Sequence, residues 1–82
     1  MATPWFAIRC PTCGQFWGEE GSHAPGEQIV RRCLLCQREV TILYGLASTG
    51  GLAITAVTDV GSGRRGDWSP LLDARVHWRE VN

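Results

Sequence analysis

The chain has 82 residues and a formal net charge of zero, because eight basic residues balance eight acidic ones. That balance leaves no strong overall field to draw the protein onto nucleic acid, and a hydrophobic content of 44% argues against wholesale disorder. A chain of this length is expected to form a single domain over residues 1–82, with a small core that needs a disulfide, a metal ion or a partner.

The first half of the chain predicts two strand–turn–strand units that follow one another. In each unit an apolar strand leads into a tight turn that contains a pair of cysteines, and an extended segment follows. A polar, glycine-rich loop at residues 19–26 separates the two units. The expected strands are residues 5–9, 15–18, 27–32 and 38–44, and the expected turns are residues 10–14 and 33–37.

The second half, from residue 45, predicts further β structure. Residues 52–60 are rich in β-branched side chains and form a hairpin with the strand before them. Residues 61–66 predict a flexible loop, and Ser69 and Pro70 are compatible with one helical turn within residues 68–73. Residues 74–81 alternate between apolar and polar side chains and predict a final strand.

The cysteines follow the pattern C-x2-C-x19-C-x2-C. Two residues between cysteines let one tight turn aim both sulfurs at a single point, and two such turns place four sulfurs about 2.3 Å from a tetrahedral ion. The separation of 19 residues lies within the range typical of zinc sites. We therefore expect one structural Zn²⁺, with no position open for a substrate and no enzymatic role. The predicted ligands are Cys10, Cys13, Cys33 and Cys36.

Three other uses of the cysteines remain open. Two disulfides need an oxidising compartment, whereas the N-terminus lacks the pattern of a secretory signal. A thioredoxin-like redox pair explains one C-x-x-C but not two. Iron fits a tetrathiolate site as well as zinc does. No apolar run is long enough to cross a bilayer, so we expect a cytoplasmic, reducing environment and no membrane partner.

The two turns carry a resemblance to a known superfamily. Residues 10–14 read C-P-T-C-G and match the C-P-x-C-G knuckle in full, whereas residues 33–37 read C-L-L-C-Q and keep only the cysteines. Residues 5–44 therefore resemble the zinc-ribbon superfamily, whose knuckle geometry rubredoxins share with iron in place of zinc. The resemblance implies a small all-β fold: a zinc ribbon of two knuckles on β-hairpins, extended by an antiparallel β-hairpin or sheet over residues 45–82.

All eight basic residues are arginine, a side chain whose planar fork suits phosphate and carboxylate. Several flank the knuckles, others lie in the flexible loop at residues 61–66, and two share a face of the last expected strand. They are candidate contacts to nucleic acid or to an acidic partner. The simpler alternative is that they offset the thiolate charge or lie in solvent. The candidates are Arg31, Arg32, Arg64, Arg65, Arg75 and Arg79.

Three functional hypotheses follow, because zinc ribbons serve many activities. The first is a nucleic-acid or nucleoprotein-binding ribbon in transcription, translation or mobile-element and phage regulation. The second is a protein–protein adaptor or structural subunit of a larger assembly, which the neutral charge, four tryptophans and open strand edges favour. A small redox or iron protein is the third, and no feature indicates a small-molecule substrate.

Overall fold

The computed structural model of the chain describes residues 4–71, and all regular structure in that range is β-strand. The expected small all-β class is therefore confirmed. The described part contains no helix, and so none with the length and apolarity that a membrane crossing requires. The strands are β1 (Trp5–Arg9), β2 (Phe16–Glu20), β3 (Gln28–Arg32), β4 (Glu39–Leu46), β5 (Leu52–Asp59) and β6 (Trp68–Leu71).

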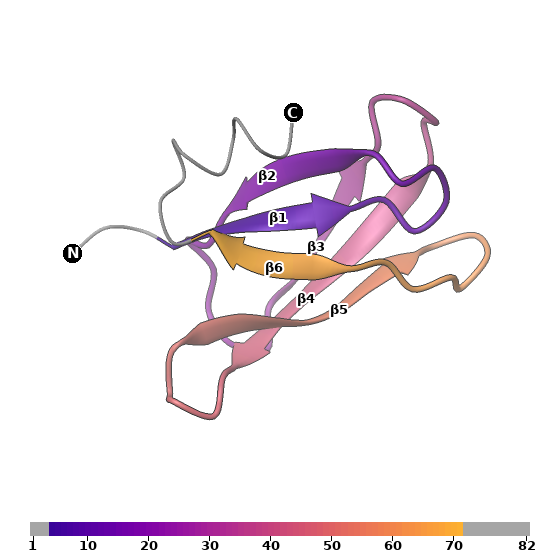
Figure 1. Cartoon of the computed structure of the whole chain (residues 1–82). Helices are drawn as coiled ribbons and strands as arrows, with labels where there is room; N and C mark the ends of the chain where they lie inside the picture. The colour runs from indigo at the N-terminus through magenta and orange to yellow at the C-terminus, as the bar shows by residue number, and fades with distance from the viewer. Residues whose placement is uncertain (1–3, 72–82) are drawn as a thin grey trace.

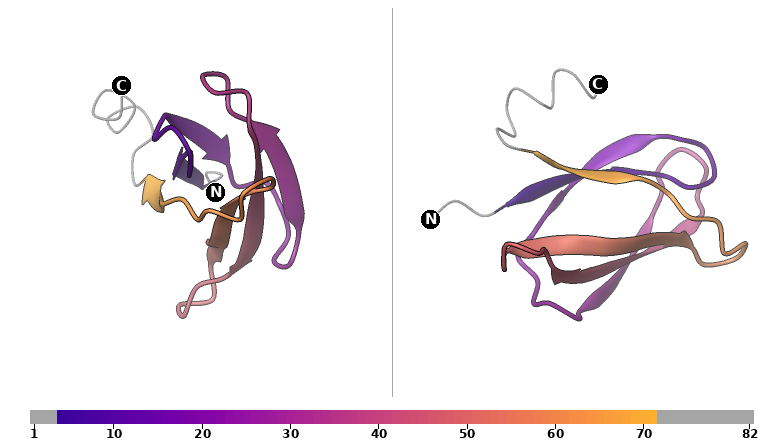
Figure 2. Two further views of the ribbon diagram at one scale, coloured as in Figure 1. Left: turned by 90° about the vertical axis from the view of Figure 1, so that its right-hand side faces the viewer. Right: turned by 60° about the horizontal axis from the view of Figure 1, so that its bottom comes forward.

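The six strands form two antiparallel sheets of three strands each. One sheet has the order β2-β1-β6 and the other the order β3-β4-β5. Figures 1 and 2 show the sheets lying one over the other, with their strands running at an angle. Each half of the ribbon thus supplies a hairpin to one sheet, and the segment after residue 45 adds one outer strand to each.

The two cysteine turns close the two hairpins at the same end of the molecule. In the first sheet the last pair before the turn is Arg9 with Phe16, and in the second it is Arg32 with Glu39. Antiparallel pairing up to the edge of each turn fixes the direction in which the turn leaves its sheet. The stacking of the sheets then brings the two turns face to face.

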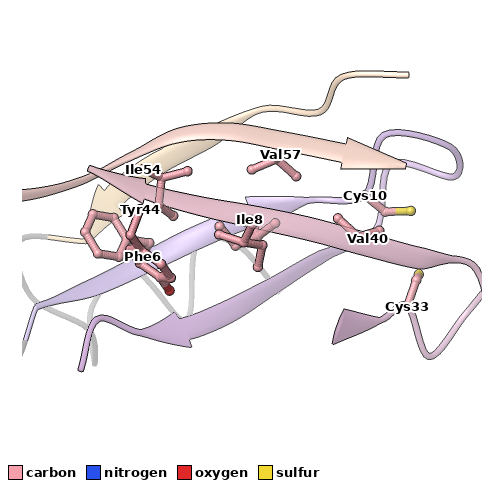
Figure 3. Packing of buried hydrophobic residues seen from close by; sticks show 9 residues of the cluster. Phe6, Ile8, Cys10, Cys33, Val40, Tyr44, Ile54 and Val57 are labelled. Carbon is pink, nitrogen blue, oxygen red and sulfur yellow. The ribbon is translucent and has the colours of Figure 1, made fainter. Parts of the chain in front are cut away.

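Between the sheets lies a small core in which two of the four cysteines take part. Phe6, Ile8 and Cys10 alternate along the first hairpin and point inward, opposite Val40, Ile42 and Tyr44 of β4. Figure 3 shows Cys10 and Cys33 at one end of this cluster and the rings of Phe6 and Tyr44 at the other. The ring centroids lie 6.1 Å apart, edge to face. The cysteine site therefore forms one end wall of the core.

Two expected assignments are wrong, beyond shifts of one or two residues at the ends of β2, β3, β4 and β5. Residues 19 and 20 were assigned to a loop but belong to β2, because the Glu19 carboxylate is buried and accepts hydrogen bonds from Trp17 Nε1 at 3.1 Å and Arg31 Nε at 2.7 Å. A satisfied buried carboxylate is compatible with a sheet although its polarity suggests a loop.

The second correction concerns residues 68–71, which form the edge strand β6 and not a helical turn. The Arg9 amide donates to the Asp67 carbonyl at 2.8 Å, and the ladder continues to Phe6 opposite Pro70. By the alternation of an antiparallel pair, the nitrogen of Pro70 then faces away from β1, where proline is tolerated. The expected strand at 74–81 lies outside the described residues.

Candidate metal centre

The first knuckle, residues 10–15, is a tight turn held by two backbone hydrogen bonds. The Gly14 amide donates to the Cys10 carbonyl at 3.0 Å, and the Cys10 amide donates to the Gln15 carbonyl at 2.8 Å. Gly14 has φ +80°, a left-handed conformation that only glycine adopts without steric cost. This geometry explains why the C-P-x-C-G pattern ends in glycine.

The second knuckle, residues 33–38, repeats the same backbone bonds with a different sequence. The Gln37 amide donates to the Cys33 carbonyl at 2.8 Å, and the Cys33 amide donates to the Arg38 carbonyl at 2.9 Å. Gln37 has φ +66° and is the one described non-glycine residue with positive φ. The missing glycine therefore does not change the fold of the turn, but the turn holds a strained residue in its place.

The four sulfurs converge on one point between the knuckles. All four Sγ atoms lie within 4.8 Å of one another. Cys10 Sγ lies 3.7 Å from Cys36 Sγ, and Cys13 Sγ lies 3.5 Å from Cys33 Sγ. Sulfurs at the corners of a tetrahedral zinc site are about 3.8 Å apart, whereas a disulfide bond is about 2.05 Å long. The four cysteines are free, and their donor set fits a tetrahedral tetrathiolate metal ion.

The protonation of these thiols is set by their surroundings. Burial of Cys33 opposes ionisation, but the backbone N–H groups of Cys36 and Leu35 and the Cys13 thiol outweigh it and lower the pKa of Cys33 to about 7. The Gln15 backbone N–H favours the Cys13 thiolate, yet lost hydration and the three neighbouring thiols raise the pKa of Cys13 to about 12. Without a metal ion the cluster therefore retains protons at neutral pH, and a bound cation must displace them.

Asp59 joins both knuckles to the end of β5. Its carboxylate is 1% exposed and accepts hydrogen bonds from the Thr12 hydroxyl, from Arg38 Nε at 2.8 Å, and from the amides of Gly61 at 2.8 Å and Ser62 at 3.1 Å. The Thr12 bond and the Arg38 guanidinium hold the pKa of this carboxyl well below its usual range. Thr12 lies in the first knuckle and Arg38 ends the second, so one ionised carboxylate braces both.

Asp59 was missed by the sequence reasoning. The only local signal is an aspartate at a strand end followed by the turn of Gly61 and Ser62, which is a common capping arrangement and carries no information about metal sites. Its partners Thr12 and Arg38 are 47 and 21 residues away. Only the tertiary fold brings them together.

The loop between β5 and β6 packs across the first knuckle. The Gly66 amide donates to the Val57 carbonyl at 2.8 Å, and a Cβ atom added at Gly66 would lie 2.4 Å from the Arg9 carbonyl oxygen. Beside this contact lies an open hollow of about 350 Å³ whose rim includes two guanidinium groups. Its lining residues are Arg9, Cys10, Pro11, Thr12, Cys13, Gly14, Arg65, Gly66 and Asp67.

The structure separates the candidate arginines into three groups. Arg31 is engaged, because its Nε lies 2.7 Å from the buried Glu19 carboxylate of the other sheet. Within residues 4–71, Arg32, Arg64 and Arg65 are exposed and no carboxylate lies within 4 Å of them. The remaining two candidates, Arg75 and Arg79, lie outside the described residues.

Arg9 belongs with the exposed group although it was not among the six candidates. Its guanidinium carbon lies 5.5 Å from the centroid of the Phe16 ring, in a cation–π geometry, and it lines the hollow beside the first knuckle. Its position directly before Cys10 mirrors that of Arg32 before Cys33. In the sequence it is one of the arginines that flank the knuckles.

Comparison with protein-family models, with curated proteins and with solved structures finds no match to this chain. The zinc-ribbon-like description therefore rests on the two sheets, the two knuckles and the cluster of four sulfurs.

Proposed function

We propose that this protein is a small non-enzymatic module, stabilised by one structural Zn²⁺, whose knuckle end binds nucleic acid or a nucleoprotein complex. The knuckle end comprises the two knuckles with the arginine that precedes each of them, residues 9–15 and 32–38, and the loop at residues 60–66. The observation that carries the proposal is the gathering there of arginines that have no acidic partner in the described part of the chain. They are Arg9, Arg32, Arg64 and Arg65.

Zinc is the proposed ion because four thiolates in tetrahedral reach are its usual structural donors. All four positions are supplied by the protein, so a bound ion has no site for water or substrate, and a structural role follows. The free thiols also support a reducing, cytoplasmic setting. Iron remains the competing ion, and metal analysis of the purified protein with its absorption spectrum separates the two.

Nucleic-acid binding is supported by a contrast between two kinds of arginine, those paired with a carboxylate and those without one in the described part of the chain. Arg31 and Arg38 each pair with a buried carboxylate, so their charge serves the fold. A tetrathiolate zinc site carries a formal charge of about −2, which also attracts nearby cations. Arg9 and Arg65 nevertheless line a hollow that opens to solvent, where guanidinium groups can reach phosphate oxygens.

Fluorescence anisotropy with labelled single-stranded and duplex 20-mers tests the proposal. Binding is expected to weaken as salt rises from 50 to 200 mM, and the double variant R9Q/R65Q is expected to reduce the log–log salt slope by roughly 1.4 to 2. The control E20Q raises the net charge by one at an exposed position far along β2 and should leave the slope unchanged. Salt-independent binding, or equal slopes for wild type and R9Q/R65Q, would overturn the proposal.

A protein adaptor or structural subunit is the second candidate. It is favoured by two leucines at the tip of the second knuckle, Leu34 at 89% exposure and Leu35 at 65%. Apolar side chains this exposed commonly mark a contact surface when they form a patch.

A further inference from the structure

The two hairpins leave two strand edges facing each other without pairing. β2 is the outer strand of one sheet and β3 of the other, and the two strands share no backbone ladder in the described structure, although the Arg31 side chain of β3 reaches the Glu19 carboxylate of β2 at 2.7 Å. The Cys33 amide donates to Arg38 and the Tyr44 amide to Glu27, which fixes the alternation along β3. The backbone N–H and C=O of Val30 therefore point away from β4 toward the free edge.

Apolar side chains gather beside this edge. Val30 is 49% exposed, and Leu34, two residues beyond the end of β3, is the most exposed large apolar residue described. A groove of about 180 Å³ separates Leu34 from β2. Sites for drug-sized ligands occupy about 300–1,000 Å³, so this groove suits one or two side chains of a polypeptide. Its lining residues are Gln15, Phe16, Trp17, Glu19, Arg31 and Leu34.

The charges around the edge indicate the chemistry of the occupant. Glu19 is buried and already satisfied by Trp17 and Arg31, so it does not repel an incoming carboxylate as a free acid would. Arg32 ends β3, is exposed, and has no carboxylate within 4 Å among residues 4–71. An acidic side chain in the incoming segment complements it.

We propose that the free edge of β3 accepts an extended segment of a partner protein, which adds as a further strand. An aliphatic side chain of that segment fills the groove between Leu34 and Trp17, and an acidic side chain pairs with Arg32. Backbone hydrogen bonds give such strand addition its affinity and the side-chain pocket gives it specificity. The inference deepens the second candidate function and does not depend on nucleic-acid binding.

The test is a display library of eight-residue peptides selected against the zinc-loaded protein. Two variants damage the proposed site by different means. V30P removes the outward amide at an edge position where proline is tolerated, and L34E places a charge at the mouth of the groove. The control L46E changes another leucine, 62% exposed, at the far end of β4. The visible spectrum of the Co²⁺ form verifies that each variant retains the four-sulfur site.

The expected result is enrichment of peptides with aliphatic residues at alternate positions and at least one acidic residue. V30P and L34E should weaken the selected peptides at least tenfold, and methylation of the peptide amides that face β3 should do the same. L46E should bind as the wild type does. Absence of enrichment, equal binding by V30P, or a wild-type dimer that L34E dissolves would overturn the proposal, the last in favour of a second copy of this chain.

Discussion

The two knuckles have the same backbone and different surroundings. Both close a hairpin with the same pair of hydrogen bonds, and both place one cysteine in the core, Cys10 in the first and Cys33 in the second. The first is packed under the loop that carries Gly66, whereas the tip of the second, at Leu34 and Leu35, lies in solvent.

This difference gives the two knuckles different roles: the first is tied to the rest of the fold, and the second exposes its tip. The first knuckle is braced by Thr12 bonded to Asp59 and by the close approach of Gly66, so its tip is tied to the rest of the fold. The second knuckle touches Asp59 only through Arg38, after the last cysteine. Its tip is therefore exposed, and the proposed ion would hold it in place.

Loss of any ligand cysteine should have the largest effect, and it should be equal for the two knuckles. C10S and C33S are each expected to lose stoichiometric metal and the β-sheet signal, because structural zinc sites contribute about 10–16 kcal/mol to folding, more than a small domain's whole stability. Metal analysis and far-UV circular dichroism measure both. A variant that keeps its sheet signal without metal would show that the core suffices alone.

Chelation provides the reversible control for those variants. Removal of the ion should unfold the wild type, and readdition of Zn²⁺ should restore it. Because metal binding displaces thiol protons, lowering the pH from neutral should release the ion and destabilise the fold. Stability that is unchanged by chelator would contradict a metal-dependent fold.

Substitution of Asp59 should have the next largest effect. D59A removes a buried carboxylate that braces both knuckles and is expected to cost about 3 kcal/mol in the zinc-loaded protein. Urea denaturation at fixed free Zn²⁺ measures that cost, and competition with a chelator should show weaker zinc affinity. E39A changes an exposed acid near the second knuckle and should lie within about 0.5 kcal/mol of the wild type. Equal stability of D59A and E39A would refute the bracing role.

The smallest expected effect concerns the left-handed position of each knuckle, which is Gly14 in the first and Gln37 in the second. Two separate variants, Q37G and G14Q, test it. Q37G should stabilise the protein by about 0.5 kcal/mol, because relief of a left-handed side chain, about 1–2 kcal/mol, exceeds the added flexibility of the unfolded chain. G14Q should destabilise it by a similar amount, about 0.5 kcal/mol or slightly more. Denaturation midpoints at fixed zinc report both signs. Destabilisation by Q37G would mean that the Gln37 side chain contributes more than its backbone strain costs.

Much of the metal site follows from local sequence. The spacing of two residues between cysteines fixes each turn and aims both of its sulfurs at one point, so each pair of thiols follows from a short stretch of sequence. The strand at Trp5–Arg9 was predicted with its observed bounds, since its apolar run ends directly at the turn. Glu19 was expected in a loop because a sequence shows the polarity of a residue. It does not show that Glu19 pairs with Arg31, 12 residues away.

The sequence by itself determined an all-β chain with two knuckles, each carrying a pair of thiols, because those features depend on residues close together along the chain. The two pairs meet only because the two sheets stack. The tertiary structure alone decided that β6 pairs with β1, that Asp59 braces both knuckles, and that Arg31 is engaged while Arg32 is exposed. These facts depend on contacts between distant segments. Their energies become available only when the two sheets pack around the core.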